Sequence, residues 1–139
     1  MNREHEFRGF DGTKWYYGDL EYNRKTGVAR IHTYDEDGSY CRQYTVDPDT
    51  IGEFTGLLDK NGVKIFEGDI VTMMRKPKKR RHYELVRHVV TCHNACDWVF
   101  ESLSNDVLGL MMVNHSGFDN YKFEVIGNIH DHSELLYNK

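Results

Sequence analysis

The amino-acid sequence alternates between short runs of apolar or aromatic residues and clusters of turn residues. In the first third of the chain this pattern predicts three strands, at Lys14–Tyr22, Val28–Tyr34 and Tyr40–Val46. In Val28–Tyr34, Val, Arg, His and Tyr alternate with Ala, Ile and Thr, which is the period of two typical of strands. The turns Asn23–Gly27 and Asp35–Ser39 are short. Three strands joined by short turns form an antiparallel meander.

A glycine-rich stretch, Thr50–Val71, follows this meander and begins a second β-unit. Asp47-Pro48-Asp49-Thr50 marks the boundary, because the residue before a proline is biased away from helical geometry and the whole segment favours a turn. Asn61-Gly62 and Gly68-Asp69 are turn dipeptides that precede β-prone residues. A Gly-Asp turn that leads into Ile-Val is common where a strand enters a small SH3-like barrel.

The remaining strands are predicted at Tyr83–Thr91, Trp98–Leu103 and Tyr121–Ile126, and Leu110–Val113 is a further apolar run. Asp131 and Glu134 have the spacing of a helix-capping box, which predicts one short C-terminal helix. The predicted fold is therefore mainly β: an antiparallel meander packed with an SH3-like small barrel. We expect a single domain over residues 1–139, with residues 1–49 and 50–139 as its two sub-units.

Composition is consistent with a soluble cytoplasmic protein. The chain has 139 residues, enough to bury a core without disulfides or a metal ion. Its three cysteines have no framework spacing, as expected of free thiols in a reducing compartment. The N-terminus lacks the apolar segment of a signal peptide, and apolar runs such as residues 108–113 are too short to span a bilayer.

A basic segment at residues 75–81 is the strongest functional signal in the composition. It carries six positive charges in a chain of net charge −4, so the rest of the chain is strongly acidic. Clustered basic side chains can neutralise phosphates, which makes this segment a candidate site for non-specific nucleic-acid binding. A solvated loop or a protein-binding loop is the favoured explanation, because no aromatic residues interleave with these charges and the rest of the chain is acidic. The candidate residues are Arg75, Lys76, Lys78, Lys79, Arg80 and Arg81.

Metal-binding and catalytic motifs are weak in this sequence. His88, Cys92, His93 and Cys96 are possible zinc ligands, but a strand would send His93 to the face opposite His88 and Cys92. We therefore predict no metal and no other cofactor. His130-Asp131-His132 and the carboxylates Asp19, Glu67 and Asp69 could serve acid–base chemistry, yet such residues at turns are usually caps. We predict that the protein is not an enzyme.

Aromatic residues are abundant in the predicted meander. Trp15 and Tyr17 should point to one face of their strand and Tyr16 to the other, so that both faces are aromatic. Part of this set is expected in the core, and part could form a self-association surface. We predict a homo-oligomer whose interface includes Trp15, Tyr16 and Tyr17.

Three blocks of the sequence, in the same order, resemble the YopX family of phage and prophage proteins. They are FRGFD with KWYYGDL, then TIGEFTGLLDKNGVKIFEGDIV, then FEVIGNIHDHSELL, and together they span almost the whole chain. The region from Met73 to Asn120 matches weakly. The resemblance implies a small β-rich protein of unassigned biochemical function, encoded by a mobile element. We therefore expect a phage or prophage accessory protein that acts as a protein-interaction or structural binding module, with a host or phage protein as its partner. Nucleic-acid binding through residues 75–81 is the alternative.

Overall fold

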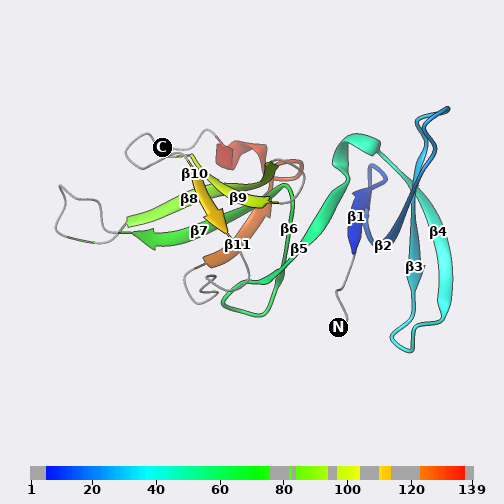
Figure 1. The fold of residues 1–139 in the computed structure, drawn as a ribbon, viewed down its shortest axis with the longest axis horizontal. Helices are drawn as coiled ribbons and strands as arrows, with labels where there is room; N and C mark the ends of the chain where they lie inside the picture. Colours follow the sequence, from blue (N-terminus) through cyan, green and yellow to red (C-terminus); the bar gives the residue numbers. More distant parts are fainter. Residues whose placement is uncertain are drawn as a thin grey trace. The chain divides into compact units, whose positions relative to one another are not determined.

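A computed structural model of the chain shows two antiparallel β-sheets (Figure 1). It describes residues 6–75, 82, 84–93, 97–103, 110–113 and 123–136. The described residues form eleven strands and two 3-10 turns. The strands are β1 (Phe7–Phe10), β2 (Trp15–Tyr22), β3 (Ala29–Tyr34), β4 (Tyr40–Val46), β5 (Gly52–Leu58), β6 (Lys64–Phe66), β7 (Asp69–Arg75), β8 (Glu84–His93), β9 (Asp97–Ser102), β10 (Leu110–Val113) and β11 (Phe123–Asn128). The 3-10 turns are η1 (Pro48–Thr50) and η3 (Ser133–Leu136).

The chain divides into an N-terminal unit, residues 1–54, and a C-terminal unit, residues 55–139. Strand β5 contributes to both: its first residues pair with β1, and β6 is its other neighbour. The sequence-predicted meander is confirmed as β2, β3 and β4, which pair in succession. In the N-terminal unit the strand order is β4-β3-β2-β1-β5.

One side of the N-terminal sheet carries its core. Ala29, Ile31 and Val46 are buried there, and Tyr16 and Leu20 of β2 pack against them. The period-two pattern of β3 accounts for this arrangement, because its buried residues are two positions apart. Gly18 lies on the same side of β2. A Cβ atom at Gly18 would overlap the carbonyl oxygen of His32, so the close approach of β2 and β3 requires glycine here.

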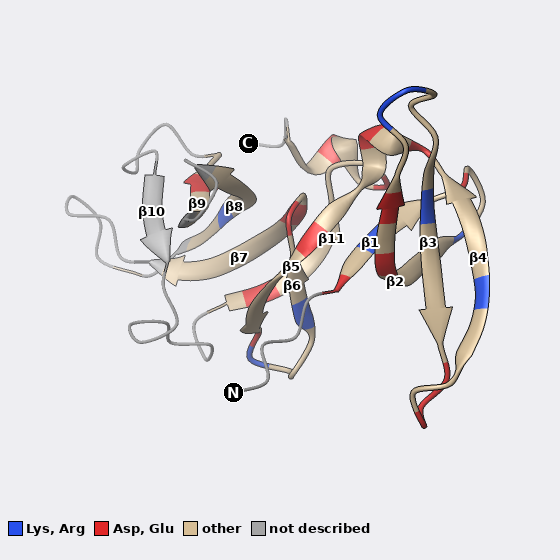
Figure 2. Ribbon diagram, turned by 45° about the vertical axis from the view of Figure 1, so that its right-hand side comes forward, with Lys and Arg blue, Asp and Glu red and all other residues tan. Residues whose placement is uncertain are grey.

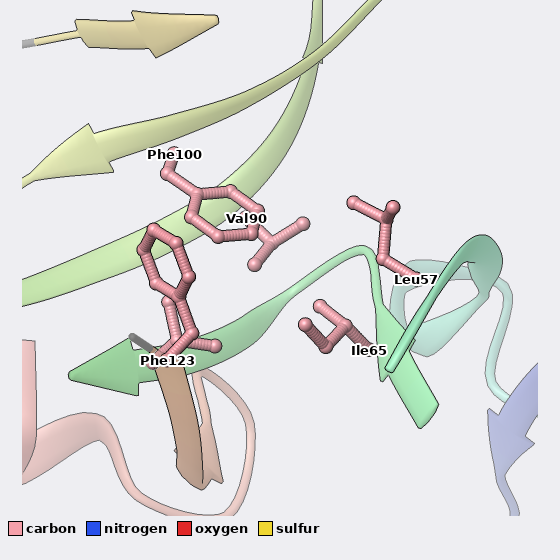
Figure 3. Close-up of a cluster of buried hydrophobic side chains, with 6 residues drawn as sticks. Leu57, Ile65, Val90, Phe100 and Phe123 are labelled. Carbon is pink, nitrogen blue, oxygen red and sulfur yellow. The ribbon is translucent and has the colours of Figure 1, made fainter. Parts of the chain in front are cut away.

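The C-terminal unit contains a five-stranded sheet in the order β10-β9-β8-β7-β11. Phe100 of β9 and Phe123 of β11 meet edge to face, with ring centroids 4.8 Å apart. Leu57 and Ile65, from β5 and β6, complete the same apolar cluster (Figure 3). The cluster therefore joins residues that are more than 60 positions apart in the sequence.

A buried carboxylate fixes the β5–β6 turn to β11. Asp59 Oδ1 accepts hydrogen bonds from the backbone N–H groups of Asn61 and Val63, at 2.8 and 2.9 Å. Its Oδ2 accepts one from the N–H of Val125, also at 2.9 Å. The sequence-predicted Asn61-Gly62 turn is confirmed, and Gly62 has the positive φ of 81° that such turns require.

Two finer features of the predicted fold are not found among the described residues. The five-stranded sheet is open, with β10 at one edge and β11 at the other, so closure into an SH3-like barrel is not confirmed. The predicted C-terminal helix is a single 3-10 turn, η3, which begins at Ser133.

The expected capping role of Asp131 is not confirmed. The preceding turn is organised by the side chain of Asn128, whose Oδ1 accepts hydrogen bonds from the N–H groups of His130 and Asp131, both at 2.9 Å. Asp131 instead accepts a hydrogen bond from the Asn128 side chain at 3.3 Å. This turn directly follows β11, which ends at Asn128, and η3 begins only at Ser133.

Candidate binding face on the N-terminal sheet

The side of the N-terminal sheet that faces away from its core is rich in aromatic and charged residues. We call it the open face. Side chains alternate along each strand, so the residues between the core positions of β2 and β3 all lie on this side. The open face is made of Arg8 and Phe10 on β1, Trp15, Tyr17, Asp19 and Glu21 on β2, Arg30, His32 and Tyr34 on β3, and Tyr40 on β4.

At one end of the open face, Arg8 and Trp15 form a cation–π contact. The guanidinium carbon of Arg8 lies 4.8 Å from the centroid of the Trp15 ring, and Arg8 is 95% buried, being only 5% exposed. Phe10 packs against the same ring at a centroid distance of 5.2 Å. Tyr17 lies opposite Arg8 in the β1–β2 register and is 45% exposed. This end therefore consists of a packed aromatic and guanidinium layer beside an exposed tyrosine.

Two more exposed tyrosines lie on β3 and β4, beside the turn that joins these strands. Tyr34 and Tyr40 are opposite each other in the β3–β4 register and are 46% and 53% exposed. Their rings meet edge to face at 5.7 Å. A hydrogen bond with the Asp19 carboxylate raises the pKa of Tyr34. Asp19 lies opposite His32, so Tyr34 reaches it along the diagonal of the β2–β3 pair.

A charged cluster lies on β2 and β3, between the tyrosine pair and the β2–β3 turn. The ring Nε2 of His32 lies 2.7 Å from Glu21 Oε1, and Arg30 Nη1 lies 3.4 Å from Glu21 Oε2. The hydrogen bond with His32, reinforced by the positive charge of Arg30, lowers the pKa of Glu21. The His32 ring also lies 5.8 Å from that of Tyr40. The charged cluster is therefore continuous with the tyrosine pair.

The predicted alternation of Trp15, Tyr16 and Tyr17 follows from the β1–β2 register. Trp15 and Tyr17 lie on the open face, whereas Tyr16 packs on the core side. There Tyr16 stacks on Tyr44, with ring planes 10° apart and centroids 3.7 Å apart. Partial burial, with a smaller contribution from Asp11, raises the pKa of Tyr16. Participation of the three residues in an interface stays a prediction.

The basic segment at residues 75–81 falls almost wholly outside the described residues. Arg75 is the last residue of β7, where it lies opposite Glu84 of β8. Lys76, Lys78, Lys79, Arg80 and Arg81 lie outside the described part of the chain. Nucleic-acid binding by this segment therefore stays a prediction.

The possible zinc ligands are divided between different environments. His88 is buried, and its ring meets that of Phe123 edge to face at 6.5 Å. Cys92 is exposed, whereas Cys96 lies outside the described residues. His93 ends β8, opposite Asp97 of β9. Within the described part of the chain, no three His, Cys, Asp or Glu side chains lie close enough together to hold a metal ion.

The carboxylates and histidines that were considered for catalysis have structural partners. Asp69 is buried and accepts a hydrogen bond from the N–H of Phe66 at 2.8 Å. The ring Nδ1 of His132 accepts one from the N–H of Asn128 at 3.2 Å, and His130 and Asp131 belong to the Asn128 turn. Asp19 belongs to the open face. These contacts position the turns around the strands.

Comparison with known families now identifies the chain. Residues 6–137 match the family described as YopX protein. The chain belongs to the YopX protein family. The match includes the open face and the C-terminal unit, and it confirms the resemblance seen in the three sequence blocks.

Other comparisons add little to this YopX assignment. The chain is similar to a solved structure described as the crystal structure of protein EF1440 from Enterococcus faecalis, with 20% sequence identity and a TM-score of 0.44. The similarity covers 97% of this chain and 99% of that one. A search of curated proteins found no match. Among the described residues of this YopX protein, no helix has the length and apolar character needed to cross a bilayer.

Arg8 is one of the open-face residues that sequence reasoning missed, with Phe10, Glu21, Arg30 and His32. It precedes Gly9, where an added Cβ atom would lie 2.6 Å from the Val46 side chain, so β1 packs tightly on its core side. The alternation along β1 then places Arg8 on the open face. Its position opposite Tyr17 could have placed Arg8 on this face. That pairing register, however, depends on the length of the turn between Phe10 and Trp15.

Proposed function

We propose that this YopX protein is a protein-binding module that uses the open face of its N-terminal sheet, and that it has no catalytic activity. The exposure of Tyr17, Tyr34 and Tyr40 on one side of a single sheet is the observation that carries the proposal. Soluble proteins bury most large aromatic side chains, and a grouped set that stays exposed is typical of an interaction surface. Tyrosine, tryptophan and arginine are also the residue types enriched at binding hot spots.

Contacts among the side chains of the open face support this role. Arg8 contacts Trp15, and Tyr34 contacts Tyr40 and Asp19, so several side chains of the open face already have partners within the sheet. Preorganised side chains lose less conformational entropy on binding, which favours affinity. The partner in this proposal is a protein of the host or of a phage, and the chain itself is a phage or prophage accessory protein. A second copy of the chain, as in the predicted homo-oligomer, is the other protein partner to be tested.

The experiment compares tyrosines on the two sides of the N-terminal sheet. The open-face variant combines Tyr17→Ser, Tyr34→Ser and Tyr40→Ser. Tyr22→Ser is the matched control, because Tyr22 is 51% exposed but lies opposite Ala29, on the core side of the sheet. Each protein is used for affinity purification from host cells with nuclease treatment, and its mass in solution is measured by light scattering.

We expect the wild-type and Tyr22→Ser proteins to retain the same partner or the same oligomeric mass, and the open-face variant to lose it. Retention of all partners by the open-face variant would exclude this face as the binding surface. Recovery of nucleic acid alone, abolished by Ala substitutions at Lys78, Lys79, Arg80 and Arg81, would favour the alternative function of the basic segment.

A further inference from the structure

The open face has a strongly acidic end. The turn Asp35–Ser39 joins β3 to β4 directly beside Tyr34 and Tyr40 and contains Asp35, Glu36 and Asp37, all exposed. Asp19 contributes a fourth carboxylate from β2. Figure 2 shows acidic residues at the β3–β4 turn and along β2, whereas basic residues lie in the β2–β3 turn at the opposite end of the strands.

The basic residues of the open face are already engaged elsewhere. Arg8 lies over Trp15, and Arg30 pairs with Glu21. Arg42 of β4 lies opposite Thr33 and so projects from the other side of the sheet. Residues 1–54 as a whole contain seven Lys and Arg against eleven Asp and Glu, a net charge of −4. The charge that the acidic end presents to a partner is therefore negative.

The aromatic rings at this end indicate which kind of cation would fit. A guanidinium or ammonium group is attracted to the face of an aromatic ring and, at the same time, to neighbouring carboxylates. The same sheet already holds one guanidinium in this way, where Arg8 lies over Trp15 at 4.8 Å. Arginine suits such a site better than lysine, because its planar group both stacks on rings and forms paired hydrogen bonds with carboxylates.

We propose that Asp19, Tyr34, Tyr40 and the Asp35–Ser39 turn bind an arginine-rich peptide segment of a partner protein. This inference rests on the proposed function and names the chemistry of its partner. Negative charge at the same surface disfavours nucleic acid, whose phosphates the four carboxylates would repel. The charge of the open face thus favours a basic protein segment, and its aromatic rings favour arginine over lysine within that segment.

The experiment measures fluorescence anisotropy with a labelled hexa-arginine peptide on the full chain at low salt. The test variant is Asp35→Asn/Glu36→Gln/Asp37→Asn, which removes three charges and keeps hydrogen-bonding oxygen atoms in the turn. The matched control is Asp11→Asn/Asp47→Asn/Asp49→Asn, which removes the same charge from turns elsewhere in the N-terminal unit. Because Asp11, Asp37 and Asp47 accept backbone hydrogen bonds, asparagine preserves those turns in both variants.

We expect the peptide to bind the test variant about tenfold more weakly than the wild type and to bind the control nearly as well as the wild type. Tyr40→Leu is a second variant that removes a ring and no charge, and it should weaken binding about threefold, whereas Tyr22→Leu should have little effect. A hexalysine peptide should bind the wild type more weakly than hexa-arginine. Circular dichroism of each variant confirms folding.

Equal weakening by the two triple variants would overturn the inference, because it would mean that only the overall charge matters. Absence of hexa-arginine binding, or stronger binding of oligothymidine than of the peptide, would also overturn it. If the peptide does not bind but the triple-serine variant still loses its captured partner, the open face is a protein-binding surface for a different chemistry. Failure of both experiments removes the proposed function as well.

Discussion

Asp59 should be among the most important single residues for the stability of the C-terminal unit. Its side chain is 1% exposed and accepts three backbone hydrogen bonds, two within the β5–β6 turn and one from Val125 of β11. A hydrogen bond to a charged group contributes roughly 1.5–3 kcal/mol, and a partly buried donor that loses its acceptor costs about 1–3 kcal/mol. Water can replace part of the lost bonding at the turn. We therefore expect Asp59→Ala to lower the free energy of unfolding by about 3–5 kcal/mol.

Asp59→Asn separates the hydrogen bonds of this side chain within the β5–β6 turn from its hydrogen bond to β11. An asparagine oxygen can still accept the two hydrogen bonds of the turn, but its NH₂ group would face the N–H of Val125. We expect a loss of about 2–3 kcal/mol, less than for alanine. Lys60→Ala is the control in the same turn. Lys60 is exposed and forms a surface ion pair with Glu124 at 3.3 Å, so this change should cost less than about 1 kcal/mol.

The assay uses the two tryptophans, of which Trp15 belongs to the N-terminal unit and Trp98 to the C-terminal unit. In a Trp15→Phe background, urea unfolding followed by fluorescence reports on Trp98, which packs against the C-terminal core cluster. With a slope of about 1.5 kcal/mol per molar urea, the Asp59→Ala midpoint should fall by roughly 2–3 M. A loss below about 1 kcal/mol for Asp59→Ala, or equal losses for Asp59→Ala and Lys60→Ala, would refute the role given to this carboxylate.

Four other changes give separate tests. Gly18→Ala should destabilise the N-terminal unit by at least about 2 kcal/mol, measured by Trp15 fluorescence in a Trp98→Phe background, because the new methyl group meets the backbone of His32. Gly127→Ala should cost about 1–3 kcal/mol, because its Cβ would lie 2.6 Å from His132 Nδ1, and a double-mutant cycle with His132→Ala should recover part of that loss. The folded-state pKa of Glu21 is lowered, so its ionised form contributes stability at neutral pH that is lost as the pH falls below the ordinary carboxyl range. In Glu21→Gln, the free energy of unfolding should therefore fall less steeply over this acidic range. The hydrogen bond to Asp35 raises the pKa of the Cys41 thiol, so in a Cys92→Ser/Cys96→Ser background iodoacetamide should modify Cys41 faster after Asp35→Asn, and an unchanged rate would contradict the assignment.

The meander was predictable because its signals are local. Alternation along residues 28–34 separated Ala29 and Ile31, which the structure buries, from Arg30 and His32, and short turns indicated the order of β2, β3 and β4. Pairing of β1 with β5 was not predicted, because it depends on contacts between residues about 45 positions apart. The hydrogen bond from the Val125 N–H to Asp59 joins residues 66 positions apart, so it could not be inferred from the turn sequence alone.

The candidate site was predictable in part. Period-two geometry separated Trp15 and Tyr17 from Tyr16. It did not show that Tyr34 and Tyr40 stay exposed on the same side as Tyr17, because a register shift between Thr33 and Tyr34 changes the alternation at the end of the β3–β4 pair. The burial of Arg8 over Trp15 could not be predicted from either strand alone, because the two residues belong to different strands. At the C-terminus the Asp131–Glu134 spacing suggested a helix, whereas the side chain of Asn128 controls the turn.

The central claim, that the open face is a protein-binding surface, is tested most directly by one comparison of purified partners. Wild-type protein, the Tyr17→Ser/Tyr34→Ser/Tyr40→Ser variant and the Tyr22→Ser control are each used as bait in nuclease-treated host lysate, with quantitative mass spectrometry of the bound proteins. The same protein should be enriched by the wild type and by Tyr22→Ser and should be absent from the open-face variant. Equal enrichment by all three baits would contradict the claim.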